Sequence, residues 1–172
     1  MKQYLVTGGA GFIGSHIVRA LLDQGAAVRV LDNFSSGKRE NLEGLRNAKN
    51  GNRFEVVEGD LRDESVVADA VRGVEVIFHE AAFVSVPESM EKPQACFDVN
   101  ITGTSILFEA ARKAGVRRAV IASSAAVYGD SDALPLKEDT PLRPPSPYAV
   151  SKHVDEMFAQ LYTSSFGLEV VE

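Results

Sequence analysis

Short runs rich in β-branched residues alternate with amphipathic stretches along the whole chain. The short runs have the length and composition of strands, and the stretches between them have the apolar spacing of helices. This pattern is expected when parallel strands are joined by covering helices. It predicts an α/β fold with a doubly wound parallel sheet in three α/β/α layers. The predicted strands are Tyr4–Thr7, Ala27–Asp32, Arg53–Glu58, Glu75–His79, Arg118–Ser123 and a last one that starts near Leu168.

Two apolar stripes at helical spacing predict helices that each cover a face of this sheet. The stripes are Ile13, Ile17, Ala20 and Leu21, and Val66, Val67, Ala70 and Val71. Two longer helices are predicted at about Pro93–Ala114 and about Pro147–Phe166. The proline-rich loop Asp130–Ser146 separates them, and we expect it to form a lid or a rim.

The composition favours one domain, residues 1–172, and excludes several classes of protein. With 172 residues and 45% hydrophobic content, the chain is long enough for one sizeable core. A net charge of -6 disfavours binding to nucleic acid or to an anionic membrane. The single cysteine, Cys96, has no disulfide partner, and no metal-site spacing is present. No stretch predicts a signal sequence or a membrane span, so we expect a cytoplasmic protein.

A glycine-rich turn, Thr7–Gly14, follows the first predicted strand and opens the first helix. Gly8 suits a tight turn, Gly11 lets the backbone approach a pyrophosphate, and Gly14 allows close packing of helix and strand. A turn that only reverses the chain is the alternative. Asp32 ends the second strand, where a carboxylate accepts hydrogen bonds from the adenine ribose and repels a 2′-phosphate. The register of Asp32 with the glycines predicts a Rossmann fold that binds NAD rather than NADP, although such an aspartate also occurs in ordinary turns.

Tyr148 and Lys152 stand four residues apart on a predicted helix, so their side chains share one face. An ammonium beside a phenol stabilises the phenolate, which a tyrosine needs to act as a base near neutral pH. Such pairs also arise by chance on helix surfaces. Ser123 and Ser124 end the fifth predicted strand, at the sheet edge where open α/β sheets place their ligands. The three polar groups of Ser124, Tyr148 and Lys152 are therefore expected beside one cofactor.

Together these motifs resemble the extended short-chain dehydrogenases/reductases, and within them the UDP-hexose 4-epimerases. The resemblance rests on Thr7–Gly14, Gly59-Asp60-Leu61, His79-Glu80-Ala81-Ala82, Asn100, Ser123–Gly129 and Tyr148–Lys152, which occur in this order. It implies that Asp60 and Leu61 border the adenine. The residues expected at NAD are Gly8, Gly11, Phe12, Ile13, Asp32, Asn33, Ser36, Gly37, Asp60, Leu61, Ala81, Ala82, Phe83, Asn100, Ser123, Tyr148 and Lys152. Ordinary loop residues, and a structural helix asparagine at Asn100, are the alternatives.

The resemblance also implies the chemistry. Tyr148 would remove the proton of the sugar 4-hydroxyl as hydride passes to NAD, Ser124 would hold and relay that proton, and Lys152 would tune the phenol and bond the nicotinamide ribose. Related 4,6-dehydratases have an Asp-Glu pair where this chain has Ala125 and Ala126, which favours epimerisation.

The sequence leaves the roles of several other residues open. Ser85 either touches the sugar or caps a helix. The hexose, N-acetylated or not, stays open, and His16, His79 and His153 receive no role.

The family's two long helices pair with the same helices of a second subunit, so we expect a homodimer through 93–114 and 147–166. The apolar positions suited to it are Phe97, Ile101, Leu107, Phe108, Met157, Phe158 and Leu161, some of which the chain's own sheet would also bury. Full-length members continue into a small domain that binds the UDP group. We therefore expect weak or no turnover by these residues alone. A stand-alone NAD-binding module and an oxidoreductase subunit completed by another chain are the competing interpretations.

Overall fold

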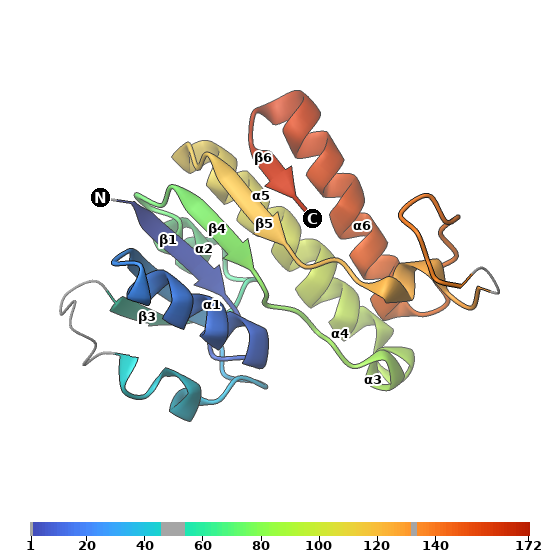
Figure 1. Cartoon of the computed structure of the whole chain (residues 1–172), viewed down its shortest axis with the longest axis horizontal. Helices are drawn as coiled ribbons and strands as arrows, with labels where there is room; N and C mark the ends of the chain where they lie inside the picture. The colour runs from blue at the N-terminus through green and yellow to red at the C-terminus, as the bar shows by residue number, and fades with distance from the viewer. Residues whose placement is uncertain (1, 46–53, 132–133) are drawn as a thin grey trace.

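Six parallel strands form one sheet in this computed structural model, which describes residues 2–45, 54–131 and 134–172 (Figure 1). The strands are β1 (Gln3–Thr7), β2 (Ala27–Asp32), β3 (Phe54–Glu58), β4 (Val76–His79), β5 (Arg118–Ile121) and β6 (Glu169–Val171). Their order across the sheet is β3-β2-β1-β4-β5-β6. This order, which reverses direction between β1 and β4, confirms the predicted doubly wound Rossmann sheet.

The observed strands lie within two residues of the predicted ones. β2 has the predicted bounds, β1 begins one residue earlier, and β5 ends at Ile121 rather than Ser123. The predicted start of the third strand, Arg53, lies outside the described residues. The strands continue to pair just beyond their ends, where the N–H groups of Gly8 and Gly59 donate to backbone oxygens of β2. These short extensions lead directly into the loops at the carboxyl edge of the sheet.

Helices cover both faces of the sheet (Figure 1). The 12-residue helix α1 (Phe12–Asp23) and the short 3-10 helix η1 (Arg39–Leu42) pack on one face, over side chains such as Val6 and Val30. The helices α2 (Glu64–Ala70), α5 (Gly103–Ala114) and α6 (Pro147–Leu161) pack on the other, over Leu5 and Ile77. Neighbouring residues such as Leu5 and Val6 thus serve opposite layers, as strand geometry requires.

One of the two predicted apolar stripes is only half right. Leu21 is buried and Ile17 packs against the core, but Ile13 is 57% exposed and Ala20 is also exposed. The buried face of α1 consists of Gly14, Ser15, Val18, Leu21 and Leu22. The cause is the close approach of the helix to the glycine turn, where a Cβ on Gly14 would lie 2.3 Å from the Gly8 oxygen. Small residues therefore occupy the inner face at this end. The second stripe is confirmed, with Val67, Ala70 and Val71 buried and Val66 packed against them.

Both long helices occur where they were predicted, but each contains a π-helical turn. Residues 93–114 form α4 (Pro93–Phe97), the π-helix η4 (Asp98–Thr102) and α5 without a break in helical backbone angles. Residues 147–166 form α6 and the π-helix η6 (Tyr162–Phe166), which ends at Gly167 with φ of 73°. π-Helical turns are often found at functional sites. η4 carries Asn100, which is only 1% exposed.

Three short helices were not predicted. They are η1, α3 (Val86–Glu91) and the 3-10 helix η5 (Ala125–Tyr128). Both α3 and η5 begin at a serine whose hydroxyl accepts a backbone N–H: Ser85 accepts from Glu88, and Ser124 accepts from Ala126. Ser85 and Ser124, for which the sequence suggested a contact to the substrate, therefore also act as helix caps.

Candidate cofactor site and catalytic residues

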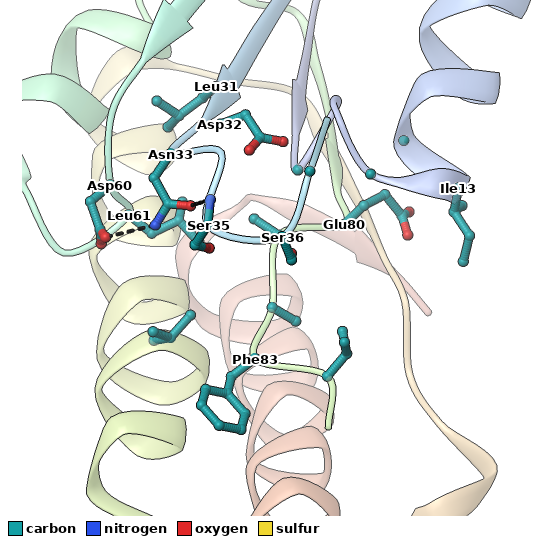
Figure 2. Close-up of a pocket in the computed structure, with 18 of the residues that line it drawn as sticks. Ile13, Leu31, Asp32, Asn33, Ser35, Ser36, Asp60, Leu61, Glu80 and Phe83 are labelled. Atoms are coloured by element: carbon teal, nitrogen blue, oxygen red, sulfur yellow. Dashed lines mark hydrogen bonds between the residues drawn. The ribbon is translucent and has the colours of Figure 1, made fainter. Parts of the chain in front are cut away.

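A cleft of about 380 Å³ lies at the carboxyl edge of the sheet, where the strand order reverses between β1 and β4. Open α/β sheets bind their ligands at such a switch point. Figure 2 shows Asp60 and Asn33 at one end of the cleft and Ile13 at the other, with Asp32 and Ser36 between them. The predicted cofactor residues that line it are Gly8, Gly11, Phe12, Ile13, Asp32, Asn33, Ser36, Gly37, Asp60, Leu61, Ala81, Ala82 and Phe83.

The glycine turn forms one wall of the cleft. Gly8 has φ of +65°, and a Cβ there would lie 2.6 Å from the Ala81 nitrogen, so this position requires glycine. Gly11 precedes the first residue of α1, and no side chain caps this end of the helix. Uncapped amides and the positive end of the helix dipole therefore face the cleft.

Asp32 is fixed beside this turn. Its side chain is buried, and its two carboxylate oxygens accept the backbone N–H groups of Ala10 and Phe34, each at 2.8 Å. Gly37 lies against the same carboxylate, since a Cβ on Gly37 would be 3.0 Å from Asp32 Oδ1. Each carboxylate oxygen has a second acceptor site, which leaves capacity for ribose hydroxyls.

A charged cluster closes the Asp60 end of the cleft. Asn33 Nδ2 donates to Asp60 Oδ2 at 2.9 Å, and the Arg62 guanidinium donates to both Asp60 oxygens at 2.8 and 2.7 Å (Figure 2 shows the Asn33 bond). The hydrogen bonds from Arg62, ahead of the Asn33 bond, hold the pKa of the Asp60 carboxyl well below its usual range. Asp60 is therefore ionised at any physiological pH.

Asn100 holds the loop that passes along the cleft after β4. Its Oδ1 accepts the Phe83 N–H at 2.7 Å, and its Nδ2 donates to the Phe83 oxygen at 3.1 Å and to Ser151 Oγ at 2.8 Å. The Ser151 hydroxyl in turn donates to the backbone oxygen of Tyr148. Asn100 is not among the residues that line the cleft. Its observed contacts position the loop on α6, as the structural alternative proposed.

The three predicted catalytic residues come from two elements that pack together, η5 and α6. Ser124 caps η5, while Tyr148 and Lys152 lie one turn apart near the start of α6. Ser146 caps that helix by accepting the Ala149 N–H at 3.1 Å. The Tyr148 N–H donates to Ser89 Oγ, which fixes the start of α6 against α3. None of these side chains lines the described cleft itself.

Lys152 is buried in an ion pair. Its side chain is 6% exposed, and its Nζ lies 2.8 Å from Asp155 Oδ2 of a side chain that is 2% exposed. Burial raises the pKa of the Asp155 carboxyl above its usual range, and the charge and hydrogen bond of Lys152 oppose this rise only in part. Next along the chain, Glu156 accepts a short hydrogen bond from the Ser123 hydroxyl and lies 3.2 Å from His153 Nδ1. The Ser123 side chain thus contacts α6 rather than the cleft.

His79 is a buried structural residue. Its Nδ1 lies 2.7 Å from the Thr7 hydroxyl and its Nε2 lies 3.0 Å from the Thr104 hydroxyl. Because the Thr104 hydroxyl donates toward the Asp155 carboxylate, we assign the Nε2–H as the donor to Thr104 and the Thr7 hydroxyl as the donor to Nδ1. Burial, with a further effect from the charge of Lys152, lowers the pKa of His79 to about 3. The ring is neutral at physiological pH.

A family model described as GDP-mannose 4,6 dehydratase matches residues 5–172. The chain belongs to this family. Its relatives include both epimerases and dehydratases, in keeping with the resemblance seen in the motifs. The UDP-glucose 4-epimerase of Mycolicibacterium smegmatis is 44% identical over 167 residues, which are 96% of this chain and 52% of that protein.

Solved structures of this family have the same fold. The UDP-glucose 4-epimerase of Thermus thermophilus, in complex with NAD, has a TM-score of 0.88 and 42% identity over 98% of this chain and 53% of its own. A dTDP-glucose 4,6-dehydratase from Streptomyces venezuelae, also with NAD, has a TM-score of 0.88 and 40% identity over 98% and 53%. The chain spans about half the length of the relatives it matches.

Sequence reasoning missed some residues of the site. Leu31, Ser35, Glu80, Val84 and Val99 line the cleft but were given no role. Glu80 follows the strand-end His79 within the quoted motif, so its position at the sheet edge was a usable signal. Burial raises the pKa of its carboxyl, and the charge of Lys152 lowers it. The pairing of Lys152 with Asp155 was also missed.

No group of histidine, cysteine, aspartate and glutamate side chains within residues 2–45, 54–131 and 134–172 has an arrangement that could hold a metal ion. In the same part of the chain, no helix is both long and apolar enough to cross a membrane.

Proposed function

We propose that the protein is an NAD-dependent 4-epimerase of a UDP-hexose of the UDP-glucose/UDP-galactose type, an isomerase for which this chain supplies the cofactor site and Ser124, Tyr148 and Lys152. The observation that carries the proposal is the cleft, because the glycine turn, Asp32 and the Ala81–Phe83 loop line it together. The epimerase relatives, among them one at 44% identity, support it.

The residues of the cleft fit a dinucleotide. The amides at Gly11, Phe12 and Ile13 would hold the pyrophosphate, and Asp32 the adenine ribose. The requirement for glycine at position 8, where a Cβ would collide with Ala81, is evidence for this close turn. The remaining predicted contacts would border the adenine end or the nicotinamide end. They are Asn33, Ser36, Gly37, Asp60 and Leu61 for the adenosine, and Ala81, Ala82, Phe83, Tyr148 and Lys152 for the other half. Asn100 and Ser123 would support this half from behind, through their bonds to Phe83 and Glu156.

The catalytic residues would remove and return one proton of the sugar. When bound, NAD accepts a hydride from the sugar and returns it to the other face. Tyr148 would take the proton of the 4-hydroxyl, with Lys152 one helical turn away on α6. Ser124 would hold the same hydroxyl from the start of η5. Ser85, which caps α3, is the proposed contact to the sugar.

Epimerisation is favoured over dehydration by Ala125 and Ala126. A dehydratase has to protonate and remove a hydroxyl, and the family's dehydratases carry acidic residues at these two positions. Ala125 and Ala126 form the first turn of η5, directly after Ser124. Alanine transfers no protons, so this turn supplies no second acid or base.

We also infer a homodimer through α6 and the helix that spans 93–114, in a cytoplasmic protein. Val150, Met157 and Leu161 share one face of α6 and are 37%, 56% and 45% exposed. Such a stripe is suited to pairing with a second helix. Leu107 and Phe108, by contrast, are fully buried in the chain's own core, so they would not take part.

The test begins with binding and proceeds to turnover. Purified protein is titrated with NADH and NADPH by fluorescence, and NADH is expected to bind at least about tenfold more tightly, about 1.4 kcal/mol. UDP-galactose, UDP-glucose and their N-acetyl forms are then assayed for interconversion, with Tyr148→Phe as the control that binds NADH without turnover. Failure to bind NADH refutes the proposal. Turnover by these residues alone is expected to be weak, so the assay uses high protein concentration and long incubation. A UDP-sugar reaction above the Tyr148→Phe background supports the proposal, and binding of NADH with no reaction above that background favours the alternative, an NAD-binding module without catalysis.

A further inference from the structure

The ammonium of Lys152 lies in a crowded and mostly buried environment. The charge of Lys152 acts on Asp155 of the same helix, on His79 of β4, on Glu80 directly after β4 and on Cys96 of α4. On α6, Glu156 acts on Asp155, and Tyr148 precedes Lys152 by one turn. His79 is neutral and Cys96 is a buried thiol whose pKa burial raises, so neither supplies a negative charge. The partner that contacts the ammonium is Asp155.

The geometry of this pair differs from that of a surface ion pair. Nζ and Oδ2 are 2.8 Å apart, and the two side chains are 6% and 2% exposed. The second oxygen, Asp155 Oδ1, is buried and has no well-formed hydrogen bond among the described residues, although the Thr104 hydroxyl lies close enough to lower the pKa of the carboxyl. A buried carboxylate with one poorly satisfied oxygen is costly, so a purely structural role is a poor account of it.

Asp155 lies on the same helix, three residues after Lys152, and both side chains are fixed by burial. An ammonium has three N–H donors, and the Asp155 bond occupies one. A buried lysine without a counter-charge tends to lose its proton, because a low-dielectric environment disfavours the charged form. A neutral lysine would no longer favour the Tyr148 phenolate.

We propose that Asp155 is a positioning residue for Lys152: it keeps the ammonium charged and fixed, and leaves its other N–H groups free for the Tyr148 phenol and a cofactor ribose. The catalytic purpose of this role rests on the proposed function, whereas the ion pair between Lys152 and Asp155 is observed in the structure. Asp155 itself would touch neither substrate nor cofactor.

The first test follows the titration of Lys152 directly. Lysine labelled with ¹³C at Cε is observed by NMR across pH, and the Lys152 signal is identified by its loss in Lys152→Arg. In Asp155→Asn, the pH midpoint of the Lys152 signal should fall by about one unit or more relative to the unchanged chain. Asp155→Glu should restore most of the shift. An unchanged midpoint in Asp155→Asn would overturn the proposal.

The matched control is Glu156→Gln, which removes the same charge from the next residue of the helix. Glu156 bonds Ser123 and His153 rather than Lys152, so its variant should shift the Lys152 midpoint much less. An equal shift in both variants would show only a general effect of nearby charge, and the specific role of Asp155 would be wrong.

NADH binding supplies a second readout. In Asp155→Asn, NADH affinity should match the unchanged chain at low pH and fall at least about tenfold as pH rises past the lowered Lys152 midpoint. A loss of the same size at every pH would indicate a structural role and contradict the proposal. If the unchanged chain does not bind NADH, the proposed function fails, while the lysine titration still decides the role of Asp155.

If Asp155→Asn does not fold, the double variant Lys152→Met/Asp155→Leu tests whether the unpaired ammonium is the cause. This variant contains neither buried charge, so neither can be left without a partner. Recovery of folding would show that Asp155 is needed to compensate the buried ammonium, as proposed. If the double variant also fails to fold, Asp155 serves packing, and the proposal is overturned.

Discussion

Acidification from pH 7 to pH 5 should destabilise the chain through His79. The ring is 3% exposed and its pKa is lowered to about 3, against a usual value of 6.5. Below about pH 6.5 the unfolded chain takes up a proton at this ring, whereas the folded chain does not until about pH 3. The contribution of His79 to stability is therefore complete above its unfolded pKa and is lost as pH falls. Over this interval the loss is about 2 kcal/mol.

The assay compares urea unfolding of the chain and of His79→Gln at both pH values. Glutamine keeps a polar side chain near Thr7 and Thr104 but does not titrate. The variant should be less stable at pH 7, by about 1–3 kcal/mol, because the ring's two hydrogen bonds are disturbed. Its further loss between pH 7 and pH 5 should be about 2 kcal/mol smaller than that of the unchanged chain.

His16→Gln is the control for this experiment. His16 is exposed on α1, so its replacement should leave the pH dependence of the unchanged chain intact. The reasoning is refuted if His79→Gln and the unchanged chain lose the same stability between pH 7 and pH 5. Such a result would mean that the imidazole takes up its proton in the folded chain.

Three further predictions concern the cleft and the residues behind it. Gly11→Ala should change the free energy of unfolding by no more than about 1 kcal/mol, since the new Cβ would meet only the Gly8 oxygen at 3.1 Å. The same variant should weaken NADH binding at least about tenfold in a fluorescence titration. Asn100→Ala removes four hydrogen bonds, of which the one to Cys96 Sγ is weak, and should lower the free energy of unfolding by about 2–3 kcal/mol in urea. A loss below about 0.5 kcal/mol would contradict its role in holding the loop. Cys96 is fully buried with a raised pKa, so a thiol reagent should modify it at least about 100-fold more slowly in the native than in the urea-unfolded chain, and comparable rates would contradict this burial.

The sheet was predictable because its signals are local. Each strand is a run of apolar residues that is bounded by turn residues, and β2 was predicted to the residue. The glycine turn and Asp32 could be related by sequence distance alone. The inner face of α1 was not predictable from apolar spacing, since close contact with the glycine turn demands small residues at Gly14 and Ser15. Apolar spacing identifies a buried face only where the packing distance admits large side chains.

Interactions between distant elements left no signal in the sequence. Arg29 on β2 donates to the Ala70 and Arg72 oxygens at the end of α2, at 2.7 and 3.0 Å, and pairs with Glu55. Only the folded chain brings these groups together. The Lys152–Asp155 spacing was visible, but its burial was not, and an exposed pair at this spacing contributes little. Sequence reasoning therefore missed part of the cleft lining, such as Glu80, and the buried contacts that support the site.

The buried contacts that support the site share one feature, which is that polar side chains hold neighbouring segments together. The Thr7–His79–Thr104 bonds connect β1 and β4 to α5, Asn100 connects the loop after β4 to α6, and the Lys152–Asp155 pair lies within α6. Apolar side chains would fill the same space, but they would not fix the direction of a loop or an ammonium. Buried polar groups do so, because each one is stable only with its own partner in place. The junction of β4, α5 and α6 thus holds the loop after β4 and the start of α6 in one fixed relation, as the proposed alignment of the Tyr148 phenol with a cofactor ring would require.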